Sequence, residues 1–156
     1  QMCIRDSGYV IANPQVIDRV KKVHDFLTVG AAAPLMEAAV TGLKFGDDYY
    51  EGLAAHYTHM KELFCGGLKN LGFTFTEPQG AYYVLMDVSE FGVKDDVKFC
   101  EWMTEHVGVA AVPGSSFFRE DVHNLIRFHF AKKDETLNAA LDNLATLRAK
   151  ADGFKE

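Results

Sequence analysis

The segment Leu125–Ala131 constrains the fold of this chain more than any other stretch of its sequence. Large apolar side chains occupy alternate positions within it: Ile126, Phe128 and Phe130. Because successive side chains of a β-strand point to opposite faces, these three residues share one face, and that face must be buried in a core. Arg127 lies on the opposite face together with His129 and Ala131. The pattern therefore predicts a strand with one buried face.

Further strands are predicted from short apolar runs bounded by glycine or proline, at residues 8–12, 73–75, 81–88 and 108–112. The run 81–88 is apolar at both odd and even positions, which is typical of a central strand covered on both faces. We expect the last two of these runs and Leu125–Ala131 to form one sheet, covered by the two helices that begin at Asp95 and Asp134.

Apolar residues that recur at three- and four-residue steps predict helices at residues 14–26, 34–43, 47–71, 95–106 and 134–147. Asn13 followed by Pro14 is a helix-start signal, with asparagine at the N-cap and proline at the first helical position. Asp134 is expected to cap the last helix. In the helix 95–106, three apolar residues are expected to face inward: Val97, Cys100 and Met103.

The order of these elements indicates an α/β or α+β layout. A length of 156 residues fits one domain or a large fragment. The long helix 47–71 suggests a boundary near Gly46, although the Gly66-Gly67 pair weakens this helix and is a place where it can bend. Residues 1–7 have no signal-peptide layout, and we interpret them as a non-native leader or an assembly scar, with a native frayed terminus as the alternative.

Composition excludes several classes of function. A formal net charge of −6 disfavours a broad nucleic-acid-binding surface, and no run of apolar residues is long enough to predict a membrane span. The three cysteines are scattered, which predicts neither a zinc site nor a disulfide framework and suits a reducing cytoplasm. His56 and His59 are three residues apart, but no carboxylate is placed to complete a metal site with them.

Arg127 is the strongest candidate for a binding role, and the pattern alone leaves two interpretations open. It can be an ordinary arginine on the solvent side of a strand. It can also be held on that strand and aimed into a pocket, where its planar guanidinium binds a carboxylate through two hydrogen bonds. The segments 77–83 and 112–118 contain Pro-Gln-Gly and Pro-Gly turns beside aromatic residues and can line such a pocket, but most such turns are only structural.

Taken together, several segments in this order and spacing resemble the class I and II aminotransferases, which are fold-type I enzymes that use pyridoxal 5'-phosphate (PLP). The matching segments are Gly-Tyr-Val-Ile-Ala at 8–12, the alanine-rich helix after Pro34, Pro-Gln-Gly-Ala-Tyr-Tyr at 78–83, Val-Pro-Gly-Ser-Ser-Phe at 112–117 and Ile-Arg-Phe-His-Phe-Ala at 126–131. The resemblance spans residue 8 to about residue 148, nearly the whole chain.

The resemblance implies an α/β fold in two parts. Residues 8–45 would be the remnant of a large PLP-binding domain. Residues 46–156 would be a C-terminal α+β small domain, opened by an interdomain helix and built on a small mixed or antiparallel sheet covered by helices. The full-length enzyme would be a cytoplasmic homodimer that moves an amino group between an amino acid and a 2-oxo acid, without a metal.

The resemblance also assigns roles to single residues. Arg127 matches the arginine that binds the substrate α-carboxylate. Gly80 and Tyr82 match a stretch that lines the substrate pocket. Thr28 begins a stretch that matches a region near the cofactor phosphate of the partner subunit.

The lysine that forms the Schiff base with PLP has no counterpart in this sequence. Family members carry it upstream of a Gly-x-Arg-x-Gly-Tyr segment, of which Gly8-Tyr9 would be the tail. The chain has Ile4 and Asp6 where that segment has glycine and arginine, with Arg5 one position out of register. This departure is expected to reflect truncation at the leader. Lys21, Lys22 and Lys44 do not match the Schiff-base position, so the chain alone is predicted to be inactive.

Two alternatives stay open at this point. Another fold-type I PLP enzyme, such as a synthase or lyase, can share the same domain. A non-enzymatic α/β module that holds a small carboxylate is the second alternative. Met36, which stands where many aminotransferases carry glutamine, leaves the subgroup undecided.

Overall fold

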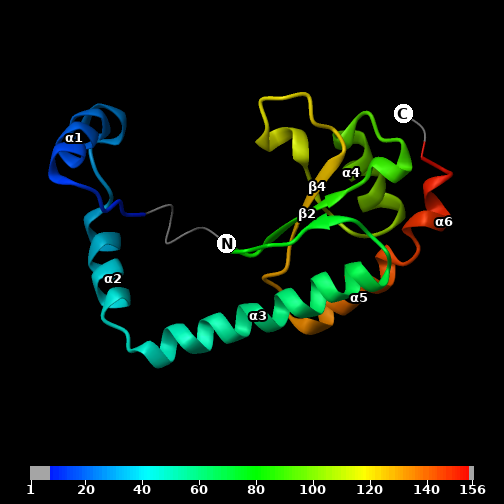
Figure 1. Cartoon of the computed structure of the whole chain (residues 1–156), viewed down its shortest axis with the longest axis horizontal. Helices are drawn as coiled ribbons and strands as arrows, with labels where there is room; N and C mark the ends of the chain where they lie inside the picture. Colours follow the sequence, from blue (N-terminus) through cyan, green and yellow to red (C-terminus); the bar gives the residue numbers. More distant parts are fainter. Residues whose placement is uncertain (1–7, 155–156) are drawn as a thin grey trace. The chain divides into compact units, whose positions relative to one another are not determined.

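The computed structural model describes residues 8–154. The predicted leader at residues 1–7, with Ile4 and Asp6, lies outside them. The chain divides into two compact units, Gln1–Glu51 and Gly52–Glu156 (Figure 1). That the first unit is the remnant of a larger cofactor-binding domain stays a prediction.

The first unit is helical. It contains α1 (Pro14–Thr28), α2 (Ala33–Leu43) and the first residues of α3 (Asp47–Asn70). Asn13 caps α1 as predicted, because its side chain accepts a hydrogen bond from the Gln15 N–H at 2.9 Å. The predicted strand at 8–12 is wrong: this segment forms no strand in the described part of the chain, and its apolar side chains are exposed.

Helix α3 continues through the Gly66-Gly67 pair without interruption. In its second half it buries four side chains: Met60, Phe64, Cys65 and Leu68. A Cβ atom on Gly67 would collide with the side chain of Leu141 in α5 (Asp134–Leu144), whereas a Cβ on Gly66 would meet nothing. Gly67 therefore allows α5 to lie close beside α3 (Figure 1).

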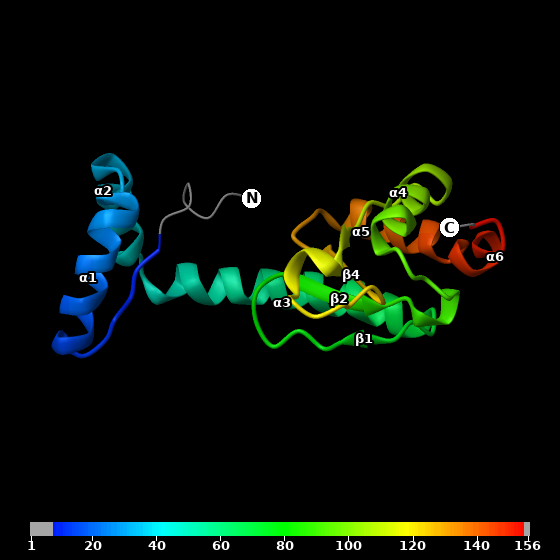
Figure 2. The same ribbon diagram turned by 90° about the horizontal axis from the view of Figure 1, so that it is seen from above.

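Four strands form one antiparallel sheet in the order β1-β2-β4-β3. They are β1 (Phe75–Thr76), β2 (Tyr83–Asp87), β3 (Val112–Pro113) and β4 (Leu125–His129). Figure 2 shows β1, β2 and β4 in succession. The prediction that β2, β3 and β4 share a sheet is confirmed. The predicted strand 108–112 is wrong for residues 108–111. These residues lead out of the preceding helix, whose end is closed by the Gly108 N–H bonding the Met103 carbonyl.

The core lies on one face of this sheet, as the alternation in β4 predicted. Ile126 is 0%, Phe128 5% and Phe130 1% exposed. Buried side chains of α3, α5 and α4 (Asp96–His106) belong to the same core. The opposite face, with Tyr83 exposed and Leu85 half-buried, is not covered by other elements to the same extent. The expectation that 81–88 is covered on both faces is therefore wrong among the described residues.

Helix α4 shows one error in the predicted inward face. Cys100 and Met103 are buried as expected, but Val97 is 45% exposed, and Phe99 is buried in its place. The buried positions 96, 99, 100 and 103 follow the helical repeat, and position 97 falls outside that stripe. Asp95 is the N-cap of α4, with its carboxylate accepting from the N–H groups of residues 97 and 98.

The C-terminal helices begin differently from the prediction. Asp134 is the first residue of α5 rather than its cap: Lys133 is the N-cap and makes no side-chain capping bond. The Asp134 carboxylate instead lies 2.8 Å from Nε2 of His59 in α3. A short separate helix, α6 (Leu147–Ala151), follows α5 and buries Leu147.

None of the helices within residues 8–154 is long and apolar enough to cross a membrane. The same residues contain no group of three or more histidine, cysteine or acidic side chains that could hold a metal ion.

Candidate functional site: the Arg127 pocket

Arg127 lies in the middle of β4, with a strand on each side. The register places it opposite Leu85 of β2 and opposite Val112 of β3. Because both neighbouring strands bond to β4, the backbone that carries this side chain is rigidly held. The guanidinium lies on the face away from the core, as the alternation predicted.

Two aromatic rings flank the guanidinium. Its central carbon lies 4.2 Å from the centre of the Tyr83 ring and 3.9 Å from the centre of the Phe117 ring. Tyr83 belongs to β2, and Phe117 ends the short 3-10 helix η3 (Gly114–Phe117) that follows β3. A cation over an aromatic face is attracted by the ring quadrupole, so these contacts restrain the orientation of the guanidinium.

Arg127 opens onto a pocket of about 530 Å³. Its lining is Thr76, Glu77, Pro78, Gln79, Tyr83, Leu85, Phe117 and Arg127. Glu77 is already engaged, because its carboxylate forms an ion pair with Lys61 at 2.8 Å. No carboxylate within residues 8–154 forms an ion pair with Arg127. The charged fork therefore faces an open pocket whose one acidic lining residue, Glu77, is paired with Lys61.

The turn that carries Phe117 packs closely against β4. Gly114 is buried, and a Cβ at this position would collide with the backbone carbonyl of Leu125. Only glycine leaves room for this approach. Of the Val-Pro-Gly-Ser-Ser-Phe segment at 112–117, the last residue, Phe117, lines the pocket.

A buried carboxylate holds the same turn from the other side. Asp96, the first residue of α4, is 0% exposed. It accepts a hydrogen bond from the Ser115 N–H at 2.8 Å, and its other oxygen lies 2.9 Å from Nδ1 of His123. Nε2 of His123 lies 2.8 Å from the carboxylate of Asp121, which completes a chain of three side chains.

The pKa values of Asp96 and His123 shift toward the charged forms. Burial raises the pKa of Asp96, but the hydrogen bonds from Ser115 and His123 outweigh it and leave the pKa below its usual range. Hydrogen bonds to Asp96 and Asp121 raise the pKa of His123. Both shifts favour an ion pair between α4 and the loop that follows η3.

Tyr82 and Gly80, the other predicted residues of the substrate pocket, are not the residues whose rings flank the guanidinium. Tyr82 is half-buried and stacks on Tyr57 of α3, with 5.8 Å between ring centres. It is Tyr83, the next residue, whose ring contacts Arg127. Gly80 is exposed and a Cβ there would meet nothing within 4 Å, so no close approach within the described residues requires glycine. Roles for Tyr82 and Gly80 in substrate binding stay predictions.

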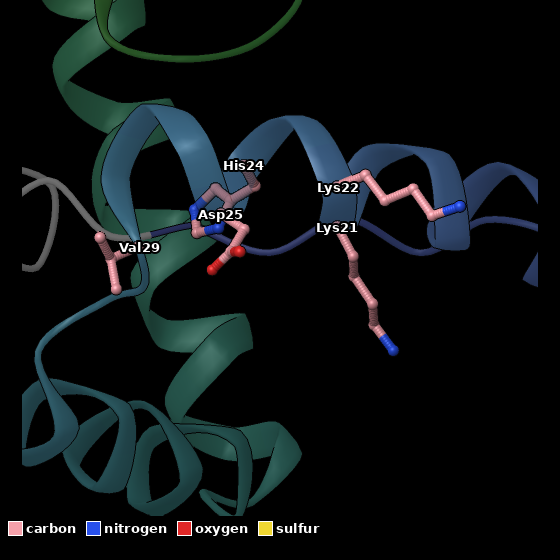
Figure 3. A pocket seen from close by; sticks show the side chains of 5 residues that line it. All are labelled: Lys21, Lys22, His24, Asp25 and Val29. Atoms are coloured by element: carbon pink, nitrogen blue, oxygen red, sulfur yellow. The ribbon is translucent and has the colours of Figure 1, made fainter.

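Thr28, the predicted phosphate-region residue, ends α1 in the first unit. Its hydroxyl lies 2.8 Å from Nε2 of His24. A nearby hollow of about 380 Å³ is lined by Lys21, Lys22, His24, Asp25 and Val29. In Figure 3 the two lysine side chains extend away from His24 and Asp25, so the polar groups do not converge on one point. The role of Thr28 stays a prediction.

Sequence reasoning missed three parts of this site. Tyr83 had a usable signal, because odd positions in β2 share the face that Arg127 occupies in β4 once the register is known. Phe117 was included only as part of a rim segment. Asp96 and His123 carried no sequence signal, since an acidic residue near a helix start and a loop histidine are both common.

Comparison with known proteins places this chain in a family. The family model "Aminotransferase class I and II" matches residues 7–144. The chain belongs to this family. It is 34% identical over 141 residues to the methionine aminotransferase of Escherichia coli, an alignment that covers 90% of this chain and 36% of that protein.

Solved structures agree. The Thermotoga maritima aspartate aminotransferase superposes with a TM-score of 0.74 at 31% identity, over 89% of this chain and 34% of that one. The Mycobacterium tuberculosis N-succinyldiaminopimelate aminotransferase gives a TM-score of 0.72 at 30% identity, over 85% of this chain and 35% of that one. The chain thus spans about a third of the length of these relatives.

Members of this family depend on PLP. Within residues 8–154 no lysine side chain is buried, and Lys61, which is half-buried, is paired with Glu77. The hydrogen bond to Glu77 raises the pKa of Lys61, which favours its protonated form over the free amine that a Schiff base needs.

Proposed function

We propose that this chain supplies the substrate-carboxylate site of a PLP-dependent aminotransferase that moves an amino group between an amino acid and a 2-oxo acid. In this proposal Arg127 binds the α-carboxylate through its planar fork. The observation that carries it is the guanidinium held between the Tyr83 and Phe117 rings, facing an open pocket and paired with no acid within residues 8–154.

Fixing the carboxylate orients the substrate. An amino acid anchored at one end has its Cα–H bond held in a defined direction, and such positioning accelerates the reaction of a bound group. The cofactor supplies the electron sink when it is bound. The amino donor is left open, because the named relatives act on methionine, aspartate and N-succinyldiaminopimelate.

We also propose that the 156-residue chain has no transaminase activity by itself, because none of its lysines matches the Schiff-base position. The working enzyme would carry that lysine on a segment outside this sequence. We place it in the cytoplasm as a homodimer. The free, buried thiols of Cys65 and Cys100 are consistent with a reducing compartment.

Substitution of Arg127 in the full-length enzyme tests the first proposal. Arg127→Lys keeps the charge but loses the planar fork. A hydrogen bond to a charged group contributes about 1.5–3 kcal/mol, so kcat/KM is expected to fall roughly 10- to 150-fold, and further for Arg127→Ala. PLP binding and the melting temperature should change little.

The control substrate is an amine without a carboxylate, for which Arg127→Lys should matter far less. Equal losses for both substrates, or loss of PLP together with activity, would show that Arg127 is structural. The second proposal is tested by adding PLP to the 156-residue chain, reducing with borohydride and mapping the peptides. One stoichiometric, site-specific lysine adduct, or turnover of any amino acid with a 2-oxo acid, would contradict it.

A further inference from the structure

We propose that Asp96 and His123 are positioning residues for Arg127: they hold the turn η3 so that Phe117 stays against the guanidinium. The inference concerns a buried acid and a loop histidine that do not line the Arg127 pocket. Its final consequence, an effect on substrate, rests on the function proposed above.

The geometry forms a continuous path from α4 to the pocket. Asp96 is fixed in the core at the start of α4 and accepts the Ser115 N–H, so its carboxylate holds the backbone of η3 directly. Two residues later the same turn presents Phe117 to the guanidinium at 3.9 Å. Because Ser115 and Phe117 are only two residues apart, a change in the hydrogen bond from Ser115 to Asp96 alters the position of the Phe117 ring.

His123 ties the far end of the loop to the same carboxylate. Nδ1 of His123 contacts Asp96 at 2.9 Å, and His123 is two residues before β4 begins at Leu125. The loop 115–123 is thus closed at both ends on one buried side chain. Phe117 itself is 45% exposed, so burial alone does not hold its ring in place.

The link depends on protonation. A protonated His123 donates from both ring nitrogens, to Asp96 and to Asp121, whereas a neutral ring donates from only one. The groups that face this pair are Asp121 in the same loop, the Ser115 N–H in η3, and the Cys100 thiol one turn along α4, whose pKa is raised by burial and by Asp96.

The direction of the pH effect follows from the shifts. Asp96 has a lowered pKa, so its contribution is present above its unfolded value of 3.8 and is lost as pH falls through the folded value. His123 has a raised pKa, so its contribution is complete below 6.5 and is lost as pH rises through the folded value. The loop is therefore held most firmly in weakly acidic solution, and the His123 contact with Asp96 weakens as His123 loses its proton, while the Ser115 N–H bond to Asp96 remains.

The first test observes the turn itself in the full-length enzyme. Phe117 is replaced by 4-fluorophenylalanine and its 19F resonance is followed from about pH 6 to pH 9. We expect one titration above the usual histidine range. Arg127→Met identifies the shift that belongs to the lost guanidinium contact.

Two variants then break the link. Asp96→Asn and His123→Ala should both place the 19F resonance at its high-pH position throughout, without a titration. His123 has a side chain that is 38% exposed, so His123→Ala leaves the core intact even if Asp96→Asn unfolds the protein. The matched control is Asp95→Asn, which alters the neighbouring N-cap of α4 and should leave the titration unchanged. An unaltered titration in His123→Ala, or none in the unsubstituted protein, would overturn the proposal.

The kinetic test separates this inference from the proposed function. Loss of one cation–π contact at an exposed site corresponds to about a two- to fivefold change in binding. His123→Ala should therefore raise KM for the amino acid by about this factor, with kcat nearly unchanged, and the difference should shrink toward high pH. If Arg127→Lys has no effect on kcat/KM, the proposed function fails while the 19F result still decides the positioning role. If Arg127→Lys is impaired and His123→Ala is not, only the positioning role fails.

Discussion

The guanidinium carbon of Arg127 lies 4.2 Å from the centre of the Tyr83 ring, although the register pairs Arg127 with Leu85 and Tyr83 with His129. The contact is thus diagonal across the β2–β4 ladder. Diagonal neighbours on one face of an antiparallel pair are within reach when the side chains are long or aromatic. Arg127 is consequently oriented by the neighbouring strand as well as by its own.

The diagonal contact predicts a difference between two substitutions at Tyr83. Tyr83→Phe keeps a ring beneath the guanidinium and should leave KM for the amino acid nearly unchanged in the full-length enzyme. Tyr83→Leu removes the ring, and a contact of this kind contributes about 0.5–1 kcal/mol, so KM should rise roughly two- to fivefold. Steady-state kinetics at fixed pH measures the effect. An equal rise for both substitutions would mean that the hydroxyl, rather than the ring, matters.

Arg148 is expected to stabilise the second unit. Its guanidinium donates to both oxygens of Glu90 at 2.9 Å and to the carbonyls of Leu71 and Gly72, just after the end of α3. Both charged side chains are more than a third exposed, so solvent screens the ion pair and most of the effect should come from the carbonyl bonds.

We therefore expect Arg148→Met to lower the free energy of unfolding by roughly 1–2 kcal/mol, measured by urea denaturation. Glu90→Gln, which removes only the charge partner, should lower it much less. If Glu90→Gln were as damaging as Arg148→Met, the ion pair and not the carbonyl bonds would be the source of stability.

The neighbouring glycines of α3 should respond in opposite directions to the same substitution. Gly66→Ala fills open space and should raise the free energy of unfolding by about 0.5–1 kcal/mol, because alanine favours the helix. Gly67→Ala places a methyl group against Leu141 and should lower it by roughly 1 kcal/mol or more. Thermal unfolding of the two variants side by side makes the comparison. Stabilisation by both would show that α5 yields easily at Leu141.

The two buried thiols should resist alkylation in the folded chain. Burial raises the pKa of Cys65 to about 11 and that of Cys100 to about 12. Only the thiolate reacts, so at about pH 8 both should be labelled by iodoacetamide far more slowly than in concentrated urea. Cys3→Ser removes the third thiol from the measurement. Fast labelling of either residue without denaturant would contradict the burial.

The raised pKa values of the two thiols also determine how the free energy of unfolding changes with pH. A raised thiol pKa means that the folded state prefers the protonated form, so this contribution is complete below the unfolded value of 9.0. It is lost as pH rises toward the folded values. Stability measured in alkaline solution should therefore fall less steeply in a Cys65→Ala, Cys100→Ala double variant.

The first unit is expected to make the 156-residue chain self-associate. Neither α1 nor α2 has a buried residue, and Ile11, Phe26 and Leu27 are 88%, 91% and 76% exposed. Large exposed apolar surfaces promote association. Light scattering should show a mass above the monomer, reduced by Phe26→Ser with Leu27→Ser. Val97→Ser, at an exposed apolar position of the second unit, serves as the control. A monodisperse monomer at high concentration would refute the expectation.

Much of the fold could be predicted locally. Helix starts such as Asn13-Pro14 and Asp95 depend on neighbouring backbone groups, so they are encoded within a few residues. The buried face of β4 follows from the period of two in Leu125–Ala131. The strand predicted at 8–12 and most of that at 108–112 failed, because a strand exists only where a partner provides its hydrogen bonds, and pairing is not visible in an isolated run.

For the candidate site, the sequence by itself determined which side of β4 carries Arg127, because alternation along a strand is a property of the backbone. Only the tertiary structure decided what surrounds it. The contacts of Arg127 with the Tyr83 and Phe117 rings, and the link from Asp96 to His123, depend on register and on loop packing between distant segments. Such contacts are selected by side-chain shape and burial in the assembled core, and no spacing rule within the chain encodes them.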